Sequence, residues 1–207
     1  RKEVIGDIDI VVAAEHSGDI MELFATLPEV EEVIVKGAKK TSIRLENGMS
    51  VDLRVVRPLE YPYALNHFTG SKEHNTVMRH IAKERGLKIN EYGVFHTVSG
   101  ERISCSDEKD IYNIFDMEYI PPELREDMGE IEAAQSDRLP NLVSESEIKG
   151  VLHVHSVYSD GVNTIEELAR HAKALGYSYI GISDHSKSAY YANGLTEEDI
   201  YRQFEEI

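Results

Sequence analysis

Asp7 and Asp9 lie two positions apart in an alternating apolar and polar stretch, which predicts a β-strand over residues 4–12. Carboxylates at positions i and i+2 of a strand project from the same face, about 6.6 Å apart along the backbone. A second predicted strand, residues 49–56, carries Asp52 on its polar face. Three carboxylates on neighbouring strands would form a cup for hard divalent cations. Two such ions, about 3.5–4 Å apart, can support an in-line phosphoryl displacement.

A second group of metal-ligating residue types lies near the end of the chain. His153 and His155 fall at positions i and i+2 of a predicted strand over residues 151–155, so they share a face. Imidazole suits Zn²⁺ or Mn²⁺, and Asp160 adds an oxygen ligand. His185 follows a later predicted strand. The chain therefore contains two chemically different candidate metal sites.

The composition is that of a globular protein, with 207 residues, 41% of them hydrophobic and 29% charged. No apolar run approaches the roughly 20 residues that a membrane span needs, and no signal-peptide pattern opens the chain. Cys105 is the single cysteine, so an internal disulfide is excluded and we expect a reducing, cytoplasmic setting. We interpret Cys105 as a small packed side chain.

The net charge of −16 is unevenly distributed. Residues 1–104 contain 14 Lys and Arg against 16 Asp and Glu, whereas residues 105–207 contain 8 against 22. The acidic excess thus lies outside the first carboxylate group. Phosphate backbones require basic surface, so we expect this chain alone to bind DNA weakly.

Hydrophobic periodicity predicts a mixed α+β unit in the first half of the chain. The expected elements are a helix after a Ser17 N-cap that ends before Pro28, a strand at 33–35, a hairpin of strands 41–45 and 49–56 around Asn47-Gly48, a helix at 71–85 and a short helix at 107–117. Residues 127–148 are acidic, poorly periodic and contain Pro140, which indicates a linker.

The pattern after Gly150 predicts a β–α–β unit. A strand at 151–155 precedes a helix at 164–175, which opens with a capping box, and a strand at 179–183 follows. This order implies two parallel strands, with the candidate ligands at their carboxyl ends.

Four strings in the first half, in this order and spacing, resemble the family X (polymerase-beta-like) DNA polymerases over residues 1–126. They are Gly6-Asp7-Ile8-Asp9-Ile10, Val51-Asp52-Leu53-Arg54, His67-Phe68-Thr69-Gly70-Ser71 and Ile89-Asn90-Glu91-Tyr92. Tyr119-Ile120-Pro121-Pro122-Glu123 is similar to the end of that catalytic core. The resemblance implies an α+β nucleotidyltransferase-type fold with palm and fingers.

The same resemblance implies catalytic roles for the acidic residues. Asp7 and Asp9 would bind both of two Mg²⁺ or Mn²⁺ ions, and Asp52 would bind the catalytic ion near the primer 3′-hydroxyl. Arg54 would pair with one of these aspartates.

Further residues would contact the substrates. The nucleotide-binding set is Gly6, His67, Phe68, Gly70 and Asn75, and Arg79 would contact the template strand. Asn75 would hydrogen-bond the minor-groove edge of the incoming base, where every base offers an acceptor. Position 67 departs from the animal relatives, which commonly carry Tyr there.

His153-Val154-His155-Ser156, Ser159-Asp160-Gly161 and Asp184-His185-Ser186 resemble the polymerase-and-histidinol-phosphatase domain over residues 149–207. The resemblance implies the start of an α/β phosphoesterase domain, a distorted seven-stranded barrel. Its metal ligands would be His153, His155, Asp160 and His185, for Zn²⁺ or Mn²⁺, with Asp184 supporting them from behind.

This domain order resembles the bacterial and archaeal branch of family X. It implies part of a DNA-directed DNA polymerase that adds dNMP from dNTP to a primer 3′-hydroxyl in gapped DNA, joined to a metal-dependent 3′–5′ exonuclease. Upstream DNA-binding modules and the rest of the barrel are expected beyond this chain, so we expect the isolated piece to be inactive. Two alternatives stay open: a phosphoesterase with a degenerate nucleotidyltransferase domain, and a non-catalytic DNA-binding scaffold.

Overall fold

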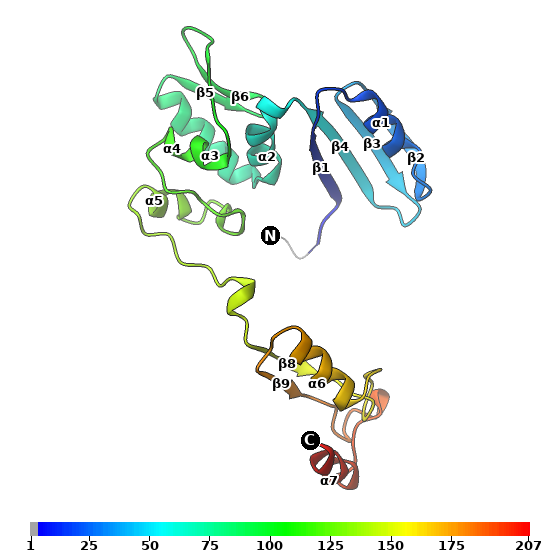
Figure 1. Cartoon of the computed structure of the whole chain (residues 1–207). Helices are drawn as coiled ribbons and strands as arrows, with labels where there is room; N and C mark the ends of the chain where they lie inside the picture. The colour runs from blue at the N-terminus through cyan, green and yellow to red at the C-terminus, as the bar shows by residue number, and fades with distance from the viewer. Residues whose placement is uncertain (1–3) are drawn as a thin grey trace. The chain divides into compact units, whose positions relative to one another are not determined.

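The computed structural model describes residues 4–207, which divide after Pro140 into two compact units. Among these residues, no helix combines the length and the apolar character that crossing a membrane requires. Figure 1 shows the elements of both units.

A four-stranded sheet with one helix forms the first part of unit 1. Its strands are β1 (Asp7–Ala13), β2 (Val30–Lys36), β3 (Lys40–Leu45) and β4 (Ser50–Val56), in the spatial order β1-β4-β3-β2. β1 pairs with β4 in parallel, and the other pairs are antiparallel. Helix α1 (Gly18–Ala25) lies against one face, as Figure 1 shows. Val51, Leu53 and Val55 of β4 are buried on that face with Met21 and Phe24 of α1. The alternation of β4 therefore places Asp52 and Arg54 on the opposite face.

One local expectation in this part is corrected. Ser17 precedes α1, but its hydroxyl donates to the carbonyl of Ala38 at 2.8 Å and makes no cap. The hairpin predicted around Asn47-Gly48 is present, and Leu45 N donates to Met49 O across its three-residue loop. Gly48 takes the left-handed conformation that such a loop requires, with φ +83°.

The second part of unit 1 builds a separate core from short elements. They are η1 (Pro58–Glu60), α2 (Tyr61–Thr69), α3 (Lys72–Glu84), β5 (Leu87–Asn90), β6 (Gly93–His96), β7 (Arg102–Ile103), α4 (Glu108–Asn113), η2 (Pro122–Leu124) and α5 (Glu130–Ala134). Buried side chains from α2, α3, α4 and α5 meet there, and Cys105 is buried among them. Ser71 caps α3 by accepting a hydrogen bond from the backbone of His74. The three-stranded sheet β5-β6-β7 was not predicted.

The linker expected at 127–148 is wrong for its first part. Ile131 and Ala134 of α5 are buried in the core of unit 1, and the unit extends to Pro140. One helical turn with two buried apolar residues is too short for periodicity to reveal. The helix expected at 107–117 is also shorter, because the chain leaves helical geometry at Asp116, which has φ +53°.

Buried polar groups connect α3, α4 and α5. His74 Nδ1 lies 2.7 Å from Glu130 Oε1, and His74 Nε2 lies 3.1 Å from the Tyr112 hydroxyl. The Arg125 side chain is fully buried and binds Glu108 Oε1 at 2.6 Å. These pairs fix the short elements against one another, because a buried charge that loses its partner is costly.

Unit 2 forms the predicted β–α–β unit. Its elements are η3 (Glu145–Glu147), β8 (Gly150–Val154), α6 (Ile165–Ala174), β9 (Tyr179–Ile182), η4 (Tyr190–Ala192) and α7 (Glu197–Glu206). β8 and β9 are parallel, and Thr164 with Glu167 forms the predicted capping box. The described residues supply these two strands only, so the seven-stranded barrel stays a prediction.

The Glu130 carboxylate predicts an acid-sensitive step in the stability of unit 1. Burial acts to raise the pKa of Glu130, but hydrogen bonds from His74 and from the backbone at Asp127 and Met128 bring it below 4.5. A depressed folded-state pKa contributes stability above the unfolded value that disappears as the pH falls through the folded value. We expect Glu130→Gln to lower the free energy of unfolding by about 2 kcal/mol at pH 7 and by less below pH 4.

Urea unfolding followed by circular dichroism at several pH values tests this. Glu132→Gln, which changes an exposed carboxylate on the same helix, is the control and should change little. An equal loss of stability at pH 7 and pH 3 would contradict the assignment.

Candidate functional site

Strand register brings the first candidate carboxylates into one row. Asp9 of β1 is paired with Asp52 of β4, and Asp52 is paired with Ser42 of β3. Paired positions on neighbouring strands project from the same face, with the strands about 4.8 Å apart. Asp7 lies two positions before Asp9 on the same face. The three predicted acidic residues therefore gather on the sheet face that α1 leaves open.

A lysine partly neutralises this row. Lys40 Nζ lies 2.5 Å from Asp52 Oδ2. Desolvation acts to raise the pKa of Asp52, but Lys40, Ser42 and the charge of Arg54 together hold it below its usual value. Desolvation and the negative charges of Asp52 and Asp7 instead raise the pKa of Asp9. Crowded carboxylates of this kind are stabilised in their ionised form by a cation.

Arg54 adopts a different contact from the one expected. Its guanidinium carbon lies 4.5 Å from the centre of the Phe68 ring, which is a cation–π geometry. The buried Nε of Arg54 has no hydrogen-bond partner among the described residues, and no ion pair with an aspartate is formed there. Arg54 thus links the acidic row to the end of α2 and acts on Asp9 and Asp52 through its charge.

One groove collects most of the predicted nucleotide-binding residues. Its volume is about 360 Å³, and it is lined by Asp9, His67, Phe68, Thr69, Gly70, Ser71, Lys72, Asn75 and Arg79. Gly70 supplies a left-handed turn between α2 and α3, with φ +61°. Gly6 and Asp7 line a neighbouring hollow together with Ser71 and Lys72. The site is therefore shared by β1, the end of α2 and the first turns of α3.

Polar groups within this groove have intramolecular partners. Asn75 Nδ2 donates to the carbonyl of His67 at 2.7 Å, and Arg79 donates to Thr76 Oγ1 at 3.2 Å. The ring of His67 meets Phe68 edge-on, with centroids 5.0 Å apart. Desolvation, together with the positive charges of Arg79 and Arg54, lowers the pKa of His67. A neutral imidazole is thereby favoured beside the groove.

Sequence reasoning missed Lys40 and Ser42. Their signal is the hairpin register, because a short loop at Asn47-Gly48 places Ser42 opposite Asp52 and Lys40 opposite Arg54. Continuing the antiparallel pairing from the Asn47-Gly48 turn along both strands would have placed Lys40 near Asp52.

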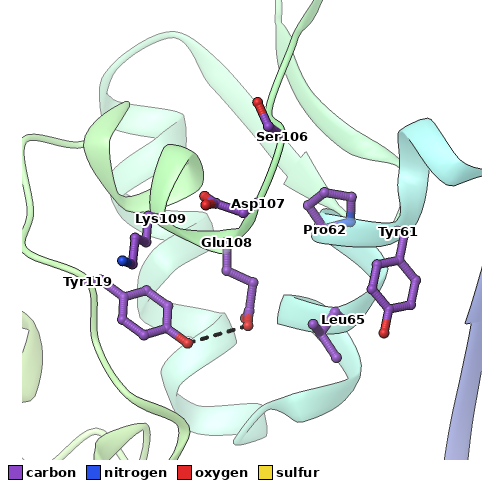
Figure 2. A pocket seen from close by; sticks show the side chains of 8 residues that line it. All are labelled: Tyr61, Pro62, Leu65, Ser106, Asp107, Glu108, Lys109 and Tyr119. Carbon is purple, nitrogen blue, oxygen red and sulfur yellow. Dashed lines mark hydrogen bonds between the residues drawn. The ribbon is translucent and has the colours of Figure 1, made fainter.

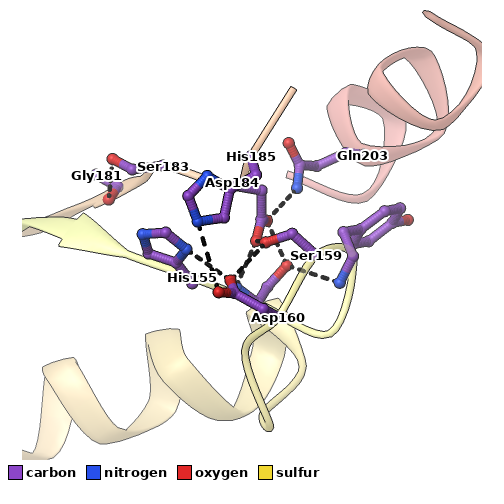
Figure 3. Close-up of polar contacts among 10 residues, drawn as sticks. His155, Ser159, Asp160, Gly181, Ser183, Asp184, His185 and Gln203 are labelled. Atoms are coloured by element: carbon purple, nitrogen blue, oxygen red, sulfur yellow. Dashed lines mark hydrogen bonds and ion pairs between the residues drawn. The ribbon is translucent and has the colours of Figure 1, made fainter. Parts of the chain in front are cut away.

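The second candidate site forms where β8 and β9 end. His155 Nδ1 lies 2.8 Å from Asp160 Oδ1, and His185 Nε2 lies 3.5 Å from Asp160 Oδ2. One ligand atom from each of these residues falls within 4.8 Å of the others. Figure 3 shows the three side chains pointing toward one another. This donor set fits a divalent ion that accepts nitrogen and oxygen ligands.

His153 stands apart from this group of three. Its side chain is exposed, and its ring stacks against His155 with centroids 5.0 Å apart. Among the described residues, the metal-ligand geometry thus includes three of the four predicted ligands. Stacking on a ligand ring allows His153 to orient His155, and ligation by His153 stays a prediction.

Asp184 holds the loop behind the site. It accepts hydrogen bonds from Ser156 N at 2.7 Å, from Ser159 Oγ at 2.5 Å and from Gln203 Nε2 at 2.6 Å. Figure 3 shows Asp184 between the loop and α7. These bonds keep the pKa of Asp184 low although desolvation acts to raise it. A Cβ at Gly161 would collide with the carbonyl of His155, so glycine lets the loop bring Asp160 to the histidines.

A further pocket in unit 1 is lined by none of the residues of the two candidate groups. It has a volume of about 270 Å³ and lies between α2 and the start of α4, as Figure 2 shows. Its lining residues include Tyr61, Leu65 and Tyr119, and the Tyr119 hydroxyl is 3.5 Å from Glu108 Oε2. It contains none of the predicted site residues.

Two family models match separate parts of the chain. Residues 64–126 match the family model described as DNA polymerase beta thumb, and residues 152–206 match the PHP domain. The family model thus describes as thumb a segment that we expected to include the fingers.

Curated relatives cover the chain to different extents. The DNA polymerase/3′-5′ exonuclease PolX of Bacillus subtilis (strain 168) is 42% identical over 208 residues, which cover 100% of this chain and 36% of the relative. The human DNA-directed DNA/RNA polymerase mu is 37% identical over 36% of this chain and 15% of its own length. Repair DNA polymerase X of African swine fever virus is 24% identical over 60% of this chain and 75% of its own length. This chain therefore spans about a third of the Bacillus protein.

A crystal structure of Leishmania infantum polymerase beta, a ternary P/T complex, is similar to this chain with a TM-score of 0.50. The likeness has 23% sequence identity and covers 59% of this chain and 62% of that one, which supports the nucleotidyltransferase-type fold. Together with the thumb and PHP matches, the similarity to the Bacillus protein along the whole chain makes this chain similar to the family X DNA polymerases that carry a PHP domain.

Proposed function

We propose that residues 4–140 form part of the catalytic core of a DNA-directed DNA polymerase. The core would transfer dNMP from dNTP to the 3′-hydroxyl of a primer in gapped DNA. One observation carries the proposal: Asp9 is in register with Asp52 and also lines the groove of Phe68, Gly70 and Asn75. The groove and the acidic row thus share Asp9. This arrangement would hold a nucleotide in the groove with its phosphates next to the metal ions.

Asp7, Asp9 and Asp52 would hold the divalent ions, with Mg²⁺ or Mn²⁺ as the expected species. When bound, such ions neutralise charge on the phosphates and favour deprotonation of the attacking hydroxyl. The residues of the groove position the nucleotide, with Phe68 and Gly70 against the sugar and Asn75 at the base. Asn75 would exchange its bond to the His67 carbonyl for one to the base. Arg79 would reach the template strand. Positioning and charge neutralisation are the main contributions of the protein to such a reaction.

Asp52→Ala tests the acidic row. We expect primer extension on one-nucleotide-gapped DNA to fall by about 100-fold or more, because the row loses the carboxylate that faces Asp9. Asp19→Ala, which removes an exposed carboxylate on α1, is the matched control and should leave extension unchanged. Full extension by the Asp52 variant would refute the proposed site.

Lys40→Met tests whether the lysine competes with the metal for Asp52. The partly exposed ion pair must open before a cation binds that carboxylate, and such pairs contribute up to about 1 kcal/mol. We therefore expect the Mg²⁺ concentration for half-maximal extension to fall by about 2- to 5-fold. Lys39→Met changes the neighbouring lysine, which lies over Tyr92, and should have no such effect. A higher Mg²⁺ requirement in the Lys40 variant would show that Lys40 assists instead of competing.

We further propose that residues 141–207 contribute to a metal-dependent phosphoesterase that removes nucleotides from DNA 3′ ends. The convergence of His155, Asp160 and His185 on one point supports this proposal. Mn²⁺ or Zn²⁺ is the expected ion. The Ser156, Ser159 and Gln203 bonds to Asp184 keep the ligand loop in place, so these residues position the site without touching the substrate.

His155→Ala in the whole protein should abolish Mn²⁺-dependent release of 3′ nucleotides and leave primer extension intact. The variant removes a ligand that also holds Asp160. His171→Ala, on the exposed face of α6, controls for loss of a histidine in the same unit. Unchanged nucleotide release would refute this part of the proposal.

The two alternatives predict distinct results in these assays. A phosphoesterase with a degenerate nucleotidyltransferase domain would release nucleotides but never extend a primer. A non-catalytic scaffold would do neither, and Asp52→Ala would leave its DNA binding unchanged.

A further inference from the structure

Two adjacent tyrosines of unit 2 are far more exposed than aromatic side chains usually are. Tyr190 and Tyr191 are 86% and 78% exposed. They form most of the short helix η4, in the segment that follows His185. Large aromatic groups at the surface of a folded protein commonly mark a site of interaction. Neither ring has a role in the folding core or in the metal-ligand group.

The segment that carries these rings is firmly held. Leu195 N donates to the carbonyl of His185 at 2.7 Å, and Ala189 N donates to the carbonyl of Ser186 at 2.9 Å. Ala192 and Leu195, which follow the tyrosines in the chain, are each 4% exposed and anchor the segment. A Cβ at Gly194 would collide with the carbonyl of Ser186, so glycine is needed for the tight closure. The exposed tyrosines therefore lie on a loop that is closed by hydrogen bonds and anchored by buried side chains.

The loop places one ring beside the candidate metal site. The centroid of Tyr191 lies 6.2 Å from that of His185, whose own ring lies 4.6 Å from His155. Tyr190 meets Tyr191 edge to face, with centroids 5.9 Å apart and an interplanar angle of 79°. One ring therefore braces the other, and the two rings cannot stack in parallel on the same flat group. Tyr191 is the ring that a group bound at the site would meet.

Charge leaves few other sources of affinity for an anionic substrate. Unit 2 contains 5 Lys and Arg against 11 Asp and Glu. Lys187, the cation nearest in sequence to the tyrosines, is paired with Glu197 at 3.1 Å. Phosphate contacts by free cations are therefore scarce within this unit. Stacking of a base on an aromatic ring is the other general way to hold a single strand, and it tolerates any base.

We propose that Tyr191, braced by Tyr190, is a stacking platform for the base of the nucleotide whose phosphoester enters the His155, Asp160 and His185 site. The inference rests on the proposed phosphoesterase function and specifies its substrate as an unpaired nucleotide end. A base stacked there would fix the terminal nucleotide beside the ligand group. The platform also predicts little discrimination among bases.

Binding without turnover gives the direct test. The whole protein is titrated, in EDTA, against a trinucleotide ending in 2-aminopurine, whose fluorescence is quenched by stacking. Tyr191→Ala should weaken binding by about 5- to 100-fold and remove the quenching. Tyr190→Ala should have a smaller effect, and Tyr191→Phe should bind like the parent because it keeps the ring. Tyr201→Ala, which removes a tyrosine that is 71% exposed on α7, is the control.

A trinucleotide with an abasic 3′ residue separates stacking from other contacts. The parent should bind it as weakly as Tyr191→Ala binds the complete trinucleotide. Equal binding of both trinucleotides by the parent would overturn the platform. So would a Tyr191→Ala variant that loses thermal stability but keeps the quenching, since the ring would then be packing against another part of the protein.

Mn²⁺-dependent release of the 3′ nucleotide tests the stacking platform and the phosphoesterase function separately. Release by the parent that Tyr191→Ala leaves unchanged, together with unchanged binding, would overturn the platform and leave the phosphoesterase standing. Absence of release by the parent would reject the phosphoesterase, whereas Tyr191-dependent quenching would still establish a base-binding surface.

Discussion

The parallel pairing of β1 with β4 is the constraint on which the first site depends. A shift of one residue would turn Asp52 toward the α1 core and expose Val51 or Leu53, so burial of the apolar face also fixes the register of the carboxylates. The same residues that stabilise the sheet therefore bring Asp9 and Asp52 together. Burial of the apolar face stabilises the sheet, and the register that it fixes also aligns Asp9 with Asp52.

The carboxylates of the two candidate sites are stabilised by different kinds of partner. At the sheet, the cations Lys40 and Arg54 lie beside Asp52, and the salt bridge from Lys40 is partly exposed. A partly exposed ion pair opens at small cost, so an incoming metal can replace the ammonium. In unit 2, Asp184 is instead held by hydroxyl, amide and backbone donors. Neutral donors add no competing positive charge, so they can shape the ligand loop without repelling a metal.

Sequence analysis identified the strands that carry both sites because their patterns are local. Alternation located β1 and β4, and the capping box located the start of α6. The missing information was tertiary. Lys40 joins the acidic row through pairing across the hairpin, and Arg54 contacts Phe68 because the fold brings α2 beside β4. Helix α5 is too short for its two buried apolar residues to reveal a helix. The four family-like strings of the first half named more candidate site residues than hydrophobic periodicity did.

The distance of each predicted metal ligand in unit 2 from the ends of β8 and β9 explains which of these residues meet. His155 directly follows β8, and His185 lies three residues after the end of β9. The loop containing Asp160 is fixed by Gly161 and Asp184, so the geometry of the group is set by the backbone. His153 lies earlier on β8 and is exposed, and it contacts the group by stacking on His155. A metal that draws His153 in would need to rotate one side chain while the backbone stays in place. The side chains of His155, Asp160 and His185 are therefore preorganised by the backbone, whereas ligation by His153 stays a prediction that a side-chain rotation would satisfy.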